Sequence, residues 1–249
     1  MEPESLNQRL SRITTLWTLV RRAHQGPGDE ARDAQRQMLD RYGGAVRRYL
    51  RALLHDADAA EDLFQEFACT LLEGDLKGAD PERGRFRNFV KGVLFHLVAK
   101  AHERRRRQPL LLSPEHPEPA AEPSESALEQ AFLTSWRDDL LARSWAALAE
   151  YEQETGRAFY AVLRCRADHP GWSSDQLAEE MSRQLGKALT PAGVRQTLHR
   201  AREKFADLLL DEVAHSLEAP TVEYLEEELI DLGLIDYCRP ALQRRQEQD

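Results

Sequence analysis

The sequence predicts an all-α protein of two helical domains joined by a linker rich in proline and glutamate. Apolar residues recur at three- and four-residue steps along most of the chain, which is the period of an amphipathic helix. That pattern stops over residues 108–125, which hold five prolines, and every Asp, Glu, Lys or Arg between Ser113 and Gln130 is a glutamate. Such a segment is extended rather than folded. We therefore expect domains at residues 1–107 and 128–217, a linker at residues 108–127 and an acidic extension at residues 218–249.

Three helices are predicted in the first domain before its basic segment. Two amphipathic segments cover residues 6–24 and 31–54, and the second contains Gly43-Gly44. Each glycine weakens a helix by roughly 1 kcal/mol relative to alanine, so a kink is one reading of this pair. The third helix follows His55 with Asp58 as its cap and Glu61 in the capping-box position.

The third helix has an acidic face opposite its apolar side. Asp62 and Glu66 form a like-charge pair at i,i+4, which costs a few tenths of a kcal/mol. Simple solvation of this face is an alternative to a binding role. The polar residues concerned are Glu61, Asp62, Gln65 and Glu66.

A basic helix is predicted from residue 83 to residue 107. It holds nine bases against one acid, on a chain whose formal net charge is −9, and such segregation is typical of polyanion-binding surfaces. The face opposite its apolar side carries Arg87, Asn88, Lys91, Phe95 and His96, and further cations follow at Lys100, Arg104 and Arg105. An aromatic ring among cations suits unpaired bases, each stack contributing ~1–3 kcal/mol. Packing of Phe95 on a neighbouring segment is the equal alternative.

The second domain is predicted to end in a helix-turn-helix. One helix is capped by Ser173 or Ser174 and stops at Gly186, and the next begins at Thr190-Pro191. Small, amide and basic side chains on the outward face of the last helix suit base edges and phosphates in a major groove. Many helical hairpins bind nothing, so this pair by itself is a weak signal. The outward residues are Ala192, Arg195, Gln196, His199, Arg200 and Arg202.

The C-terminal extension is predicted to contain one short amphipathic helix from Tyr224 to Ile235. Nine acids from Asp211 to Asp236 precede the first base, Arg239. Two hypotheses stay open for this segment. It lies against the basic surfaces of the chain and restrains them, or it is a terminal helix packed on its own domain.

Composition indicates an intracellular protein without a cofactor. The three cysteines are far apart and show no metal-ligand spacing with the histidines, so neither a disulfide framework nor a metal site is expected. No apolar run is long enough for a membrane span, and the N-terminus lacks signal-peptide features. We expect a cytoplasmic location and no membrane partner.

Three motifs in order resemble a bacterial sigma factor of the extracytoplasmic-function type. They are DADAAEDLFQEF, then RFRNFVKGVLFHLVAKAHERRRR, and after the linker TPAGVRQTLHRAREKF, so the resemblance spans about Leu39 to Leu210. The chain departs from the family pattern with Phe89 where a tryptophan is usual and with Phe95-His96 where an Arg-Asn pair is common. The turn GKALTP is also longer than usual.

The resemblance implies a subunit that starts transcription with RNA polymerase. The acidic face of Glu61, Asp62, Gln65 and Glu66 would dock on the polymerase clamp helices. The basic helix would melt and hold the minus-ten element of promoter DNA, and the last helix pair would read the minus-thirty-five element. An anti-sigma factor or another regulator is a further candidate partner.

Two other functions are weighed against this one. A helix-turn-helix regulator that does not touch polymerase would leave the acidic face without a purpose. A nucleic-acid-processing enzyme would need carboxylates clustered beside the basic groove, and no catalytic set of that kind is present.

Overall fold

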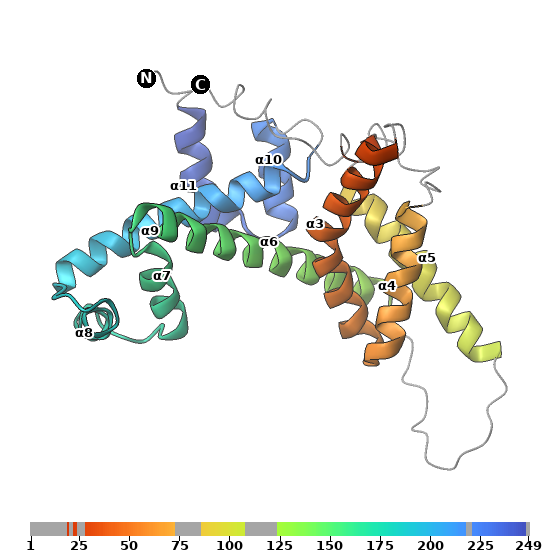
Figure 1. Cartoon of the computed structure of the whole chain (residues 1–249), viewed down its shortest axis with the longest axis horizontal. Coiled ribbons are helices and arrows are strands. Elements are labelled where there is room, and N and C mark those ends of the chain that lie inside the picture. The colour runs from red at the N-terminus through yellow and green to blue at the C-terminus, as the bar shows by residue number, and fades with distance from the viewer. Residues whose placement is uncertain are drawn as a thin grey trace, which may run out of the picture. The chain divides into compact units, whose positions relative to one another are not determined.

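The computed structural model describes residues 19, 22–23, 28–72, 86–107, 124–217 and 221–247, with the side chains of residues 105–107 left out. Every regular element in these ranges is a helix, which confirms the all-α class (Figure 1). Most of the helix predicted at residues 6–24 and the linker residues 108–123 lie outside the described residues. No helix in the described part of the chain has the length and apolar character needed to cross a membrane.

The helices form two compact units that divide within one long helix, α6 (Glu125–Thr155), after Asp139. The first unit contains α3, α4, α5 and the beginning of α6, and the second contains the rest of α6 and α7 to α11. The sequence-based ranges place the division in the linker instead. Those ranges, as functional domains, stay a prediction.

Helix α3 (Gly28–Leu54) runs without interruption through the glycine pair. The two glycines let neighbouring elements approach closely. A Cβ on Gly43 would lie 3.3 Å from a ring atom of Phe64, and one on Gly44 would lie 2.5 Å from Asp139 Oδ1. The close approach of Phe64 and Asp139 gives this glycine pair a packing role.

Helix α4 (Ala57–Leu72) begins earlier than the sequence suggests. Asp56 Oδ1 accepts hydrogen bonds from the backbone N–H groups of Asp58 and Ala59, both at 3.1 Å. The prediction of Asp58 as the cap is therefore wrong. His55, with φ of 51°, is the one residue between the end of α3 and Asp56, so α4 is capped two residues sooner than predicted.

Aromatic rings from three helices form the core of the first unit. Tyr42 of α3 stacks on Trp136 of α6 at 5.3 Å between ring centroids, and Tyr49 meets Phe132 edge-on at 5.6 Å. Phe86, the first residue of α5 (Phe86–Arg107), lies 5.5 Å from Tyr42. The beginning of α6 therefore packs with the N-terminal helices, although its sequence predicts a place in the second domain.

The second unit is built around α9 (Pro191–Ala214), preceded by α7 (Phe159–Asp168) and α8 (Ser174–Leu185). Ser173 caps α8 in a capping box with Gln176, and Gly186 ends it in the left-handed conformation. Thr190 Oγ1 accepts from Gly193 N at 3.1 Å at the start of α9. These ends are where the sequence predicts them, and Ser173 settles the choice between two caps.

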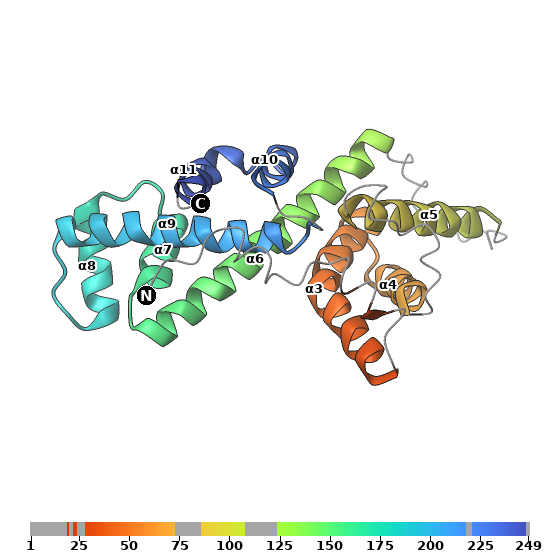
Figure 2. The same cartoon turned by 90° about the horizontal axis from the view of Figure 1, so that it is seen from above.

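The C-terminal extension forms two helices, α10 (Val222–Asp231) and α11 (Ile235–Gln246), not one. Both pack on α9 (Figure 2). Leu225 and Leu229 are fully buried, and Arg245 reaches Asp211 at 2.7 Å. Basic residues of the extension thus meet acids of α9, so the hypothesis of a terminal element packed on its own domain is confirmed.

Candidate functional site

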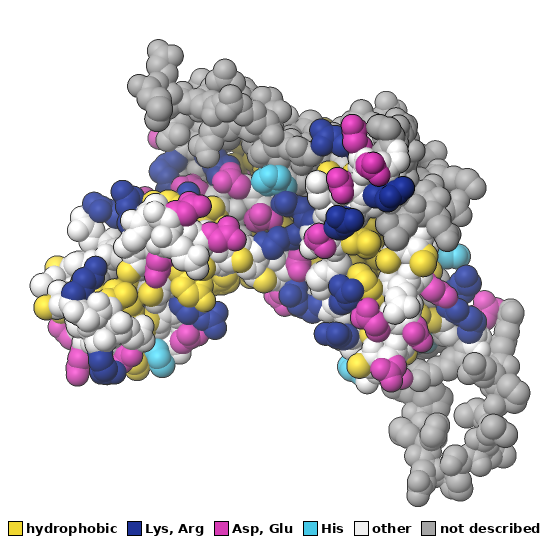
Figure 3. Space-filling model, in the orientation of Figure 1, with side chains coloured by type: hydrophobic (Ala, Val, Ile, Leu, Met, Phe, Trp, Pro, Cys, Tyr) yellow, Lys and Arg dark blue, Asp and Glu magenta, His cyan; other side chains and the backbone are white. Residues whose placement is uncertain are grey.

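The acidic face of α4 is only partly open to solvent. Asp62 and Gln65 are exposed, whereas Glu61 and Glu66 are half-buried. Glu61 accepts from Arg47 Nε at 3.3 Å, and the Arg47 guanidinium also lies over the Phe64 ring. On the face shown in Figure 3, acidic and basic side chains alternate over α3 and α4. The face therefore presents Asp62 and Gln65 directly, beside carboxylates that already have partners.

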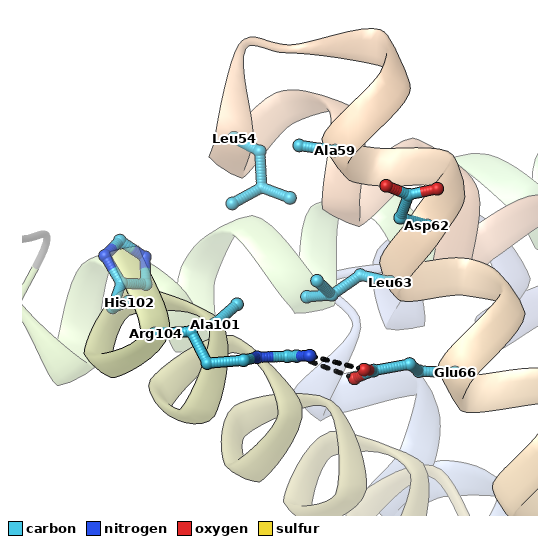
Figure 4. Close-up of a pocket in the computed structure, with 8 residues that line it drawn as sticks. All are labelled: Leu54, Ala59, Asp62, Leu63, Glu66, Ala101, His102 and Arg104. Atoms are coloured by element: carbon cyan, nitrogen blue, oxygen red, sulfur yellow. Dashed lines mark hydrogen bonds and ion pairs between the residues drawn. The ribbon is translucent and has the colours of Figure 1, made fainter. Parts of the chain in front are cut away.

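Glu66 holds a side chain of the basic helix. Arg104 donates from Nη1 to Glu66 Oε1 at 2.7 Å and from Nη2 to Oε2 at 2.9 Å (Figure 4). This is the two-bond geometry in which guanidinium and carboxylate planes fit best. The hydrogen bonds from Arg104 hold the pKa of the Glu66 carboxyl below its usual 4.5, helped by the charges of Arg104 and Lys100 and opposed by partial burial. Residues predicted for two different partners are thereby joined.

A hollow of about 310 Å³ lies beside this ion pair, between α4 and α5 at the end of α3. Leu54 and Leu63 project into it, with Asp62 one turn from Glu66 on the α4 side (Figure 4). The full lining comprises Leu54, Ala59, Asp62, Leu63, Glu66, Ala101, His102 and Arg104. The hollow thus combines an apolar floor with carboxylates on one wall and basic side chains on the other.

The basic helix keeps part of its predicted surface. Asn88, His96, Lys100 and Arg104 are exposed along α5. Arg105 belongs to the last turn of α5, and its side chain lies outside the described part. These positions fit a helix whose outward side meets a polyanion.

Arg87 is buried and Lys91 is half-buried, although both are predicted to point to solvent. Arg87 is only 5% exposed. Lys91 donates to Glu129 Oε1 of α6 at 2.6 Å, and this bond, with the charges of Lys91 and Arg87, holds the pKa of the Glu129 carboxyl below its usual value. The beginning of α6 lies against this part of α5. A helical wheel of α5 alone does not contain that neighbour.

Phe95, for which the sequence leaves stacking on bases and packing on a neighbour as equal alternatives, is half-buried. Its ring lies 6.5 Å from that of Tyr49 at an interplanar angle of 22°. The alternative reading, packing against a neighbouring segment, is the one that the structure supports. Tyr49 is fully buried in α3, so it holds one side of the Phe95 ring in place.

Helices α4 and α5 and most of α3 belong to a segment that matches a known protein family. Residues 38–108, which span α4, α5 and most of α3, match the family model described as Sigma-70 region 2. The chain carries a sigma-70 region 2 domain. Region 2 is the part of sigma-70 family factors that binds core RNA polymerase and takes part in promoter melting, and these factors start transcription without being enzymes. Comparisons with curated proteins and with solved structures found no match.

In the matched part of the chain, the acidic face and the exposed cations lie on adjacent helices. The acidic residues are on α4 and the exposed cations on α5, and the Glu66–Arg104 pair joins them. Among the described residues, no group of His, Cys, Asp or Glu has the arrangement of a metal site.

The predicted base-reading residues of the second unit all lie on the surface of α9. All six are exposed: Ala192, Arg195, Gln196, His199, Arg200 and Arg202. His199 Nε2 is 3.8 Å from Glu203 Oε1, and the Tyr237 hydroxyl of α11 donates to the Arg202 carbonyl at 3.4 Å. The extension therefore reaches the last residue of this face and leaves the others accessible.

Sequence reasoning missed two residues that shape the region 2 surface. The run of glutamates assigns Glu129 to an acidic stretch without a base, but Glu129 pairs with Lys91. A helical wheel points Arg47 outward, but Arg47 pairs with Glu61. The sequence does hold a signal that could have found Glu129. Helical spacing of apolar residues begins at Leu128, so Glu129 belongs to an amphipathic helix that must pack one side against a neighbour.

Proposed function

We propose that the chain is a sigma factor of the extracytoplasmic-function type that directs core RNA polymerase to specific promoters from the cytoplasm. The observation that carries the proposal is the region 2 match over residues 38–108, which covers helices with an acidic and a basic face. The order of motifs along the chain supports the subtype.

The polymerase surface that we propose is the α4 face of Glu61, Asp62, Gln65 and Glu66. Asp62 and Gln65 are exposed and meet a partner without any rearrangement. We expect the clamp helices of core polymerase to be that partner. An anti-sigma factor or another regulator that covers the same face would compete with polymerase.

The minus-ten strand would lie along the exposed side of α5. Asn88 and His96 are eight residues apart, about two helical turns, and both offer hydrogen-bonding groups to bases. Lys100 and Arg104 follow as phosphate contacts, and we place Arg105 with them. Phe95 presents only the part of its ring that Tyr49 leaves open, while Lys91 and Arg87 support the helix from its covered side.

The minus-thirty-five element would be read by α9. Gln196 and His199 are the candidates for base edges, and the flanking arginines for phosphates. Truncation of the Gln196 side chain should relax the preference at one base-pair position by about 1–3 kcal/mol, whereas truncation of a phosphate-binding arginine should weaken binding to all sequences alike.

The test is co-purification with core polymerase followed by run-off transcription from selected promoter sequences. We expect the wild-type chain to bind core polymerase and to support specific initiation. Asp62→Ala should weaken polymerase binding, and Asp58→Ala, an exposed acid at the start of the same helix, should not. Gln196→Ala should change the selected upstream sequence, and Gln243→Ala, exposed on α11, serves as its control. A wild-type chain that does not bind core polymerase would refute the proposal.

A further inference from the structure

The Glu66–Arg104 ion pair joins the two working faces of the region 2 domain. Glu66 belongs to the proposed polymerase surface on α4, and Arg104 belongs to the proposed DNA surface on α5. Both guanidinium Nη atoms donate to the two carboxylate oxygens, at 2.7 and 2.9 Å. While this pair is closed, that edge of Arg104 is not available to a phosphate, and each Glu66 oxygen already accepts one hydrogen bond from Arg104.

Both side chains remain within reach of partners. The Arg104 side chain is 50% exposed and that of Glu66 is 35% exposed, so neither is sealed in the core. The hollow beside them gives access from the α4 side through Asp62, which is exposed. A partner that seats on this wall meets Glu66 at its edge and competes with Arg104 for the carboxylate.

We propose that polymerase, when it binds at Glu66, breaks the Glu66–Arg104 ion pair and so releases Arg104 for promoter DNA. We call this coupling the lock. The lock rests on the proposed function, because it needs polymerase on α4 and DNA on α5. By linkage, the coupling works in both directions: freeing Glu66 strengthens polymerase binding, and freeing Arg104 strengthens DNA binding.

The expected size of the effect is small but measurable. A surface ion pair changes an equilibrium constant by about two- to fivefold, and salt reduces the effect. An effect of that size weakens DNA binding by the free protein, and it is too small to prevent initiation once polymerase is bound.

The first measurement is the affinity of core polymerase for Arg104→Gln. Arg104 lies outside the proposed polymerase surface. We expect the Arg104→Gln variant to bind core polymerase about two- to fivefold more tightly than wild type at low salt. Lys100→Gln is the matched control, since Lys100 acts on Glu66 only through its charge. Arg104→Lys, which keeps the charge but not the two parallel bonds, should fall between wild type and Arg104→Gln.

The second measurement is the binding of a fluorescent single-stranded DNA oligonucleotide to the free full-length chain. Glu66→Gln should bind about two- to fivefold more tightly than Asp62→Asn, which removes the same charge one turn away on α4. The gain should disappear when Arg104→Gln is added to Glu66→Gln, and it should shrink as salt rises.

The outcomes separate the lock from the proposed function. If wild type binds core polymerase but Arg104→Gln binds no more tightly than Lys100→Gln, the lock is refuted and the sigma-factor function stands. If Glu66→Gln binds DNA no more tightly than Asp62→Asn, the lock is likewise refuted. If wild type does not bind polymerase, the proposed function itself fails. Helical circular dichroism equal to wild type establishes that each variant is folded.

Discussion

Replacing Leu229 by alanine should weaken the packing of the C-terminal helical hairpin, α10 and α11, on α9 without disturbing the region 2 domain. Leu229 is 0% exposed in α10, which packs on α9, so the change removes buried methyl groups and leaves a cavity. Leu→Ala changes at such sites cost about 2–5 kcal/mol. At about 1.4 kcal/mol per factor of ten, amide exchange that depends on opening of this unit should accelerate roughly 30- to 4,000-fold.

Hydrogen exchange followed by mass spectrometry resolves this effect by segment. Peptides from α9, α10 and α11 should exchange faster in Leu229→Ala, while peptides from α3 report on the other unit. Ile230→Ala is the control, because the neighbouring Ile230 is 56% exposed and its truncation should change stability by no more than about 0.5 kcal/mol. Equal exchange in the two variants would show that the hairpin does not stabilise α9. Acceleration in α3 as large as in α9 would show that the units are not independent.

Three further predictions concern the ion pair, the glycine pair and the cysteines. Because its pKa is lower in the folded chain, the Glu66 carboxylate contributes stability above its ordinary pKa of 4.5, and that contribution is lost as the pH falls through the folded pKa. The difference in urea midpoint between wild type and Glu66→Gln should therefore shrink below pH 4.5. A difference that stays constant with pH would contradict this. Gly44→Ala should lower the thermal midpoint, because its Cβ would stand 2.5 Å from Oδ1 of the buried Asp139. The overpacking cost of about 1–3 kcal/mol outweighs the roughly 1 kcal/mol that alanine gains over glycine within a helix. Gly28→Ala, at the first residue of α3, has open space and should be neutral. A thiol reagent such as DTNB should modify only Cys69 in the native chain, because Cys69 is exposed and the other two cysteines are buried. Burial also raises the pKa of the Cys238 thiol to about 12. Fast reaction of all three cysteines before unfolding would disprove this burial.

Local signals determined much of the fold. The helical period of apolar residues predicts α3, α4, α5 and α9, because each helix must bury one side whatever its neighbours are. Ser173 and Gly186 mark the ends of α8 because caps depend on hydrogen bonds and backbone angles within a few residues. Helix α11 is not predicted, since Pro240 stands inside it and its apolar positions are few.

The sequence by itself determined which charges each helix carries, and the tertiary structure decided which of them remain open to a partner. Arg87 and Lys91 belong to a basic helix by sequence, but in the folded unit Arg87 is buried, and Lys91 is half-buried and bonded to Glu129 of α6, 38 positions along the chain. Glu66 and Arg104 are equally distant along the chain, and only the packing of α4 on α5 brings them together. A helical wheel describes a helix in isolation, whereas the exposure of its polar face depends on neighbours that the local pattern does not specify.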